Sequence, residues 1–265
     1  MIAQDVQDYL QSLARHWEYP TDTVDTFKAG DPQAVARGIA VGWMSYTWAL
    51  QRALDLGCNV FITHEPTYYS HWDNDQDILR LASVRAKKRF IEESGLAIIR
   101  CHDLWDQMTD IGIPDSWGQL LALGKAIDGD TYIRVYDAGG RRAGDLARHV
   151  ARCTAAYGQP GVQLIGSEEK IIRRVSIGTG AITPYLECVK RFAIDLAICT
   201  DDGMDYWRDG AFAIDMDIPI IVVNHMVSEE IGLQRLAETL SRQFPTVPVH
   251  HIAQRCMYRL IGGSD

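Results

Sequence analysis

The stretch Val-Phe-Ile-Thr-His-Glu-Pro-Thr at residues 60–67 decides the predicted fold. A run suited to a buried strand ends abruptly in His64 and Glu65. Pro66 then prevents the strand from continuing, because proline lacks the N–H that a central strand donates. In an open α/β sheet, ligands bind beyond the carboxyl ends of the strands. The stretch therefore predicts a buried strand that delivers a His and a Glu to the ligand-binding edge of a sheet.

The same pattern recurs twice along the chain. An apolar run before residue 100 leads to Cys-His-Asp-Leu-Trp-Asp at 101–106, and the run 218–223 leads to Asn-His-Met-Val-Ser-Glu at 224–229. His, Asp and Glu together suit ions such as Zn, Mn, Fe or Mg, and carboxylates can bridge two metals. Three strand ends with such ligands predict one shared metal site built from distant parts of the sequence.

Each of these side chains also has an ordinary structural explanation. A His at a strand end can be a satisfied core residue, and Glu65 can form a salt bridge. Glu229 can be a first-turn acid favoured by the helix dipole, with Ser228 as the N-cap. That explanation does not account for His225, which follows five apolar residues and an Asn. If the chain is helical from residue 227, His225 and Glu229 lie at or near one face of the first turn.

Strand and helix patterns alternate along the whole chain, which is typical of an α/β protein with parallel strands. We expect strands at 38–42, 59–63, 96–100, 129–135, 161–165, 172–177, 196–200, 218–223 and 247–252. We expect helices at 3–17, 47–57, 78–94, 118–127, 144–157, 185–193, 206–216 and 229–244. A turn is expected at 137–140, and the glycines of 178–181 could cradle an anion at a helix start.

Composition narrows the class of protein. The 265 residues are 47% hydrophobic, which is enough for a large core in one elaborate domain or two modest ones. The net charge of -9 leaves no basic stripe, so we expect no nucleic-acid partner. The N-terminus is acidic where a signal peptide is basic, and the apolar runs are only strand length, so we expect no membrane association. Six cysteines without a CxxC pair indicate reduced, buried thiols in a cytoplasmic protein.

From about residue 36 to 252 these motifs occur in the order of the Nif3-like family, and the chain resembles it. These are the dinuclear-metal-centre hexameric proteins often labelled GTP cyclohydrolase type 2 homologues. His64 and Glu65 stand where the family has a His-His pair, and 102–106 has the spacing of its His-Thr-Asn-Leu-Asp segment. Residues 224–229 are close to the closing Gly-His-x-x-Ser-Glu motif, and 177–181 look like its glycine-rich turn. The closing motif is the most specific.

The resemblance implies a set of metal ligands: His64, Asp106, His225 and Glu229, with Glu65 at the fifth position. A carboxylate in place of the family's imidazole would harden the site. The closing glycine is also replaced, by Asn224. The implied fold is a single Nif3-like unit with two β/α lobes, roughly 1–128 and 129–265, flanking a metal cleft. The implied assembly is a homohexamer.

The resemblance further implies one or two divalent ions (Zn, Fe, Mn or Mg) and a hydrolase that acts through metal-activated water. Its substrate would be a nucleotide or another small heterocyclic or phosphorylated molecule. His102 is the candidate catalytic residue for proton transfer, because it lies one turn or loop from Asp106. The alternative is a non-catalytic metal-binding scaffold or regulatory partner. We expect six aromatic residues to line a pocket or a contact between subunits: Trp43, Tyr46, Trp48, Tyr68, Tyr69 and Trp72.

Overall fold

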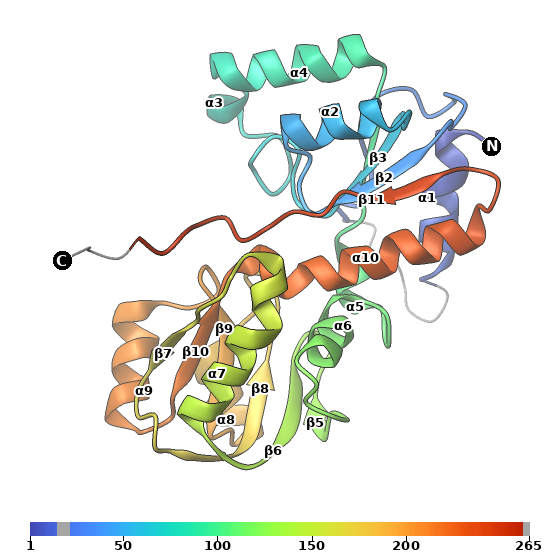
Figure 1. The fold of residues 1–265 in the computed structure, drawn as a ribbon. Coiled ribbons are helices and arrows are strands. Elements are labelled where there is room, and N and C mark those ends of the chain that lie inside the picture. The colour runs from blue at the N-terminus through green and yellow to red at the C-terminus, as the bar shows by residue number, and fades with distance from the viewer. Residues whose placement is uncertain (15–21, 262–265) are drawn as a thin grey trace. The chain divides into compact units, whose positions relative to one another are not determined.

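The computed structural model describes residues 1–14 and 22–261, so Trp17 of the first predicted helix lies outside the described residues. The chain forms two compact units (Figure 1). Unit 1 consists of Met1–Met108 and Leu233–Ala253, and unit 2 consists of Thr109–Gly232 and Gln254–Asp265. The lobes expected from the sequence, roughly 1–128 and 129–265, stay a prediction. The mixed α/β class is confirmed, because each unit combines one sheet with helices.

Unit 1 contains a sheet with the strand order β1-β4-β3-β2-β11. The neighbours β11, β2, β3 and β4 run parallel, whereas β1 pairs antiparallel with β4. The strands are β1 Phe27–Ala29, β2 Ile39–Gly42, β3 Val60–Thr63, β4 Ala97–Arg100 and β11 Val249–His251. The helices are α1 Ala3–Ser12, α2 Thr47–Asp55, α3 Gln76–Leu79, α4 Ala82–Ser94, α5 Asp103–Gln107 and the second part of α10 His225–Gln243. Every residue of β2, β3 and β4 is buried, which explains why these strands read as unbroken runs rather than alternating ones.

Unit 2 contains a sheet with the order β5-β6-β8-β9-β10-β7. Its centre, β8-β9-β10, is parallel, and the outer pairings are antiparallel. The strands are β5 Asp128–Gly129, β6 Arg134–Arg142, β7 Gln163–Ile165, β8 Ile171–Ile177, β9 Leu196–Thr200 and β10 Ile220–Val223. The helical segments are α6 Ile113–Leu120, α7 Ala143–Thr154, η1 Ala155–Tyr157, α8 Tyr185–Phe192, η2 Tyr206–Gly210, α9 Ala211–Asp215 and the first part of α10.

Strand register places the predicted site residues. In unit 1, Thr63 pairs with Arg100, so β3 and β4 end side by side and the residues that follow them leave the sheet at the same edge. In unit 2, Val223 pairs with Thr200, so β9 and β10 likewise end together. The carboxyl ends of these parallel strands form the edge at which α/β sheets bind ligands.

Several predicted boundaries were wrong. The helix expected at 118–127 is α6, which begins at Ile113 with a proline in its first turn and ends at Leu120. The turn expected at 137–140 is an irregularity inside β6, where the register with β8 shifts. β1 and α5 were not predicted at all. Among the described residues, no helix combines the length and apolar content needed to cross a membrane.

Candidate metal-binding site

His64 follows β3 directly, and the end of the neighbouring strand fixes its ring. Its Nδ1 lies 3.1 Å from the backbone oxygen of Cys101, the residue after β4. A carbonyl oxygen only accepts, so Nδ1 is the donor in this contact, and Nε2 is the ring nitrogen left to face a metal. That Nε2 lies 3.5 Å from Oδ1 of Asp106 on α5. The imidazole is therefore buried, held through Nδ1 and turned toward a carboxylate.

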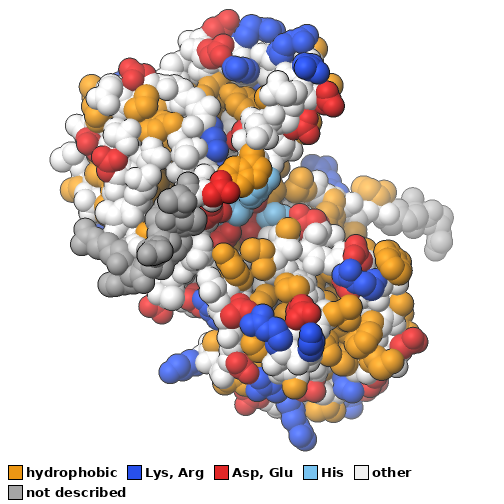
Figure 2. All heavy atoms as spheres, turned by 180° about the vertical axis from the view of Figure 1, so that it is seen from behind, with side chains coloured by type: hydrophobic (Ala, Val, Ile, Leu, Met, Phe, Trp, Pro, Cys, Tyr) orange, Lys and Arg blue, Asp and Glu red, His pale blue; other side chains and the backbone are white. Residues whose placement is uncertain are grey.

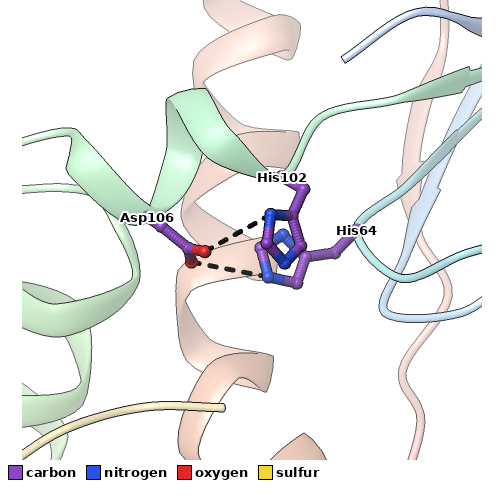
Figure 3. A group of neighbouring side chains, drawn as sticks. All are labelled: His64, His102 and Asp106. Atoms are coloured by element: carbon purple, nitrogen blue, oxygen red, sulfur yellow. Dashed lines mark ion pairs between the residues drawn. The ribbon is translucent and has the colours of Figure 1, made fainter. Parts of the chain in front are cut away.

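His102 and Asp106 complete a group of donors around His64 (Figure 3). The His102 ring stacks on the His64 ring with centroids 4.6 Å apart. Its Nδ1 lies 2.9 Å from Asp103 Oδ1 and 3.6 Å from Asp106 Oδ2. One ligand atom from each of His64, His102 and Asp106 lies within 4.8 Å of the others. We call these three residues donor group 1.

Asp25 holds α5 in the position that creates donor group 1. This buried carboxylate accepts the backbone N–H groups of His102, Asp103 and Leu104 at 2.6, 3.1 and 2.8 Å. The Asp103 side chain accepts in return from the Thr23 hydroxyl at 2.7 Å. Burial raises the pKa of the Asp103 carboxyl, but hydrogen bonds from His102 and Thr23 outweigh burial and leave that pKa well below its usual range. The short helix thus begins on a carboxylate from a distant segment.

Glu65 lies beside donor group 1. One of its carboxylate oxygens is within 4.8 Å of a ring nitrogen of His64, and its Oε2 lies 3.9 Å from Nη2 of Arg100. Glu65 is not part of the cluster that His64 forms with His102 and Asp106. Its assignment as a metal ligand stays a prediction.

In unit 2, the start of α10 carries a second set of donors. His225 Nε2 lies 3.1 Å from Glu229 Oε2, one helical turn along, as the spacing predicted. His225 Nδ1 lies 2.7 Å from Oδ2 of Asp202, which follows β9. A carboxylate on one ring nitrogen fixes the tautomer and leaves the other nitrogen as the donor to a metal. We call His225 and Glu229, together with Asp202 as the residue that orients the His225 ring, donor group 2.

Backbone contacts in unit 2 hold donor group 2 in place. Asp201 Oδ1 accepts the His225 N–H at 3.0 Å, and its Oδ2 accepts the Asn224 side-chain amide at 2.8 Å. This long-range cap lets α10 begin at His225, four residues earlier than expected. Ser228 therefore lies inside the helix, where its Oγ donates to the His225 carbonyl at 2.7 Å, and its assignment as the N-cap was wrong.

The glycine-rich turn lies against donor group 2. A Cβ added to Gly180 would come within 2.5 Å of Glu229 Oε1 and 2.9 Å of His225 Nε2. Gly180 also has a positive φ of 52°. The glycine is thus needed because two donor side chains occupy the space that a side chain at residue 180 would fill.

Sequence reasoning missed Asp202, Asp201 and Asp25. The first two had a readable signal, because Thr-Asp-Asp-Gly at 200–203 follows an apolar run, as the predicted ligands do. Asp25 had none, since it lies in a polar segment and acts on residues far along the chain. The predicted ligands His64 and Asp106 meet in donor group 1, and His225 and Glu229 meet in donor group 2.

The chemistry of both groups suits a divalent ion. Each combines imidazole nitrogen with carboxylate oxygen, the mixture that Zn, Mn and Fe accept. His64 and His225 each direct one ring nitrogen to a fixed acceptor and the other toward a carboxylate. Metal-binding histidines are usually oriented in this way.

Two α/β units with such donors at their strand edges define a candidate metal-binding α/β protein. The chain belongs to the Duf34/NIF3 (NGG1p interacting factor 3) family, whose model matches residues 1–256. This confirms the resemblance drawn from the motifs. No curated protein matches the chain.

Solved structures share the fold at low sequence identity. A Staphylococcus aureus protein, SA1388, has a TM-score of 0.81 at 13% identity, over 98% of this chain and 99% of that one. A Bacillus cereus protein related to NIF3 has a TM-score of 0.81 at 12% identity, with the same coverage. Reduced HcgD from Methanocaldococcus jannaschii has a TM-score of 0.71 at 14% identity, over 95% of this chain and 98% of that one. At these identities the likeness establishes the fold alone.

Proposed function

We propose that this protein binds one or two divalent metal ions through His64 and Asp106 of donor group 1 and His225 and Glu229 of donor group 2, with Glu65 as a further ligand. The observation that carries the proposal is the orientation of His64 and His225. Each ring is held through Nδ1, and each Nε2 faces a carboxylate oxygen. Elemental analysis of the purified protein should show whether the ion is Zn, Fe, Mn or Mg. The sequence prediction that all the ligands share one centre stays a prediction.

We further propose that the protein is a hydrolase acting on a nucleotide or another small heterocyclic or phosphorylated substrate. A bound ion would lower the pKa of a water molecule and make it a nucleophile at neutral pH. His102 is suited to hold and move a proton, since its Nδ1 lies between the carboxylates of Asp103 and Asp106. Family membership supports the reaction class only by analogy. A metal-binding scaffold without activity is the alternative.

Metal content tests the ligand assignment. His64→Ala and His225→Ala should each lower the metal bound per chain, and the affinity at the affected group should fall by more than about 100-fold. The reason is that mutating even a residue that only orients a metal ligand lowers metal affinity about 10- to 100-fold. Elemental analysis of purified protein measures the effect. His250→Ala, a histidine outside both groups, is the matched control. Equal metal content in His225→Ala and wild type would contradict the role of His225.

Turnover separates the hydrolase from the scaffold. A panel of nucleotides, phosphoesters and cyclic amides should contain a substrate whose hydrolysis needs metal. His102→Ala should then keep its metal while kcat falls on the order of 100-fold, because positioned proton transfer contributes about 10²- to 10⁴-fold. A fully metallated wild type that hydrolyses nothing on the panel would favour the scaffold.

A homohexamer is also part of the proposal, and the resemblance supports it. Two of the aromatics expected on the surface, Trp43 and Tyr68, are buried, while Trp48, Tyr69 and Trp72 are exposed. Further exposed apolar side chains lie on η2, on α9 and directly after α9 in unit 2: Tyr206, Trp207, Ile214 and Met216. Figure 2 shows hydrophobic side chains gathered at several places on the molecular surface. Light scattering should report a mass several times the 29.7 kDa of one chain. A monomer at micromolar concentration would contradict the hexamer.

A further inference from the structure

Arg100 is a buried cation beside the proposed ligands of unit 1. It is the last residue of β4 and only 1% exposed. Its Nε donates to the His64 carbonyl at 2.8 Å and its Nη1 to the His71 carbonyl at 2.5 Å. Within the described residues its Nη2 makes no hydrogen bond, and Glu65 Oε2 lies 3.9 Å from it. The third nitrogen therefore faces a carboxylate without binding it closely.

The loop after β3 is built around this cation. Asp73 accepts the backbone N–H groups of Thr67 and Tyr68 at 3.1 and 2.5 Å, which closes the loop on itself. Lys87 donates to the Thr67 carbonyl at 2.6 Å, and burial lowers the pKa of Lys87 to about 8, against the opposing effect of Asp73. The loop that follows Glu65 is thus held by its own hydrogen bonds.

Two positive charges compete for one carboxylate in this arrangement. A metal ion held by His64 and Glu65 would share the Glu65 oxygens with the Arg100 guanidinium. Charges of like sign repel strongly in a buried environment, because the effective dielectric constant is low. A buried cation also needs negative partners. Glu65 stabilises the charge of Arg100 more than Asp73, Asp25 and Asp103 do.

We propose that Arg100 is a positioning residue that holds Glu65 by charge and limits the affinity of donor group 1 for divalent metal. The inference rests on the proposed metal binding and adds its regulation by a charge within the chain. Without metal, Arg100 is the positive partner of Glu65. Metal binding therefore requires the Glu65 carboxylate to be shared between Arg100 and the ion, or transferred to the ion. Removing the charge at residue 100 should make metal binding tighter.

A purely structural Arg100 predicts the opposite sign. Its hydrogen bonds to the carbonyls of His64 and His71 hold the ligand loop, and losing them should weaken metal binding. Arg100→Lys loses the guanidinium geometry but keeps the charge. Arg100→Gln loses both. The two variants therefore separate geometry from charge.

The test is a titration of the full chain with Mn²⁺ against a competing chelator. We expect Arg100→Gln to bind Mn²⁺ on the order of tenfold more tightly than wild type, and Arg100→Lys to remain near wild type. Glu65→Gln should weaken Mn²⁺ binding. The loss should be larger in the Arg100→Gln background, because there the Glu65 carboxylate binds the metal without competition from the guanidinium. Weaker or unchanged binding in Arg100→Gln, or equal effects of Glu65→Gln in both backgrounds, would overturn the proposal.

A second comparison covers the case in which Arg100→Gln alone does not fold, because it leaves Glu65 without its buried partner. The Glu65→Gln, Arg100→Gln double variant removes both charges together. It should bind Mn²⁺ more tightly than Glu65→Gln alone, since the repelling guanidinium is gone, but by less than about tenfold, because no Glu65 carboxylate is released to the metal. Equal affinities would overturn the role of Arg100. Folded wild type that binds no metal would instead overturn the proposed function, and this inference with it.

Discussion

Gly180→Ala is expected to lower metal affinity at donor group 2 on the order of 100-fold. The new Cβ would lie 2.5 Å from Glu229 Oε1 and 2.9 Å from His225 Nε2, closer than non-bonded atoms approach. The turn cannot move away easily, because Thr200 Oγ1 donates to the Gly180 carbonyl and Gly180 N–H donates to Ser228 Oγ. The donor side chains must therefore move from their present positions.

The control for this prediction is Gly139→Ala. Gly139 also has a positive φ, of 65°, but among the described residues no atom lies within 4 Å of an added Cβ. Both variants should lose about 1 kcal/mol of stability from backbone strain. Only Gly180→Ala should lose metal, as measured by calorimetric titration. Equal metal affinity in the two variants would show that the glycine serves the backbone alone.

The sequence predicted the parts of the candidate site that depend on local pattern. β3 and β10 could be predicted because a strand buried on both faces is apolar throughout. The polar residues that come directly after these two strands were easy to recognise next to the apolar runs. Because adjacent parallel strands end at the same edge of the sheet, the residues that come after them lie close together there. This is why His64 and Asp106 could be predicted to meet from general α/β architecture.

Features that depend on distant partners could not be predicted. The beginning of α10 at His225 depends on Asp201 after another strand, whereas the local pattern favoured a start at the acids that follow Ser228. The position of Arg100 at the end of a strand suggested no relation to Glu65, because their proximity arises only from the register of β3 with β4. Long-range capping and pairing of charges leave no periodic signal in a single sequence.

Asp25→Ala is expected to destabilise unit 1 by about 3 kcal/mol or more, the largest stability effect that we predict. The substitution removes the acceptor of three backbone N–H groups at the start of α5, and each buried donor left unsatisfied costs about 1–3 kcal/mol. The five-residue α5 has no local replacement, because His102 at its N-cap makes no capping hydrogen bond. The urea midpoint should fall by about 1 M or more, given slopes of about 1–3 kcal/mol per M.

The same substitution should also release metal from donor group 1, because α5 carries Asp106 and begins after His102. Asp31→Ala is the matched control. This exposed carboxylate in the same N-terminal region accepts the backbone N–H of Gln33 at 2.9 Å, and its loss should change stability by less than about 0.5 kcal/mol. Metal binding by donor group 2 should survive in Asp25→Ala, since its ligands lie in unit 2. If Asp25→Ala unfolds at the wild-type midpoint and keeps all its metal, the start of α5 is held by contacts other than the Asp25 carboxylate, and the construction of donor group 1 around that carboxylate is wrong.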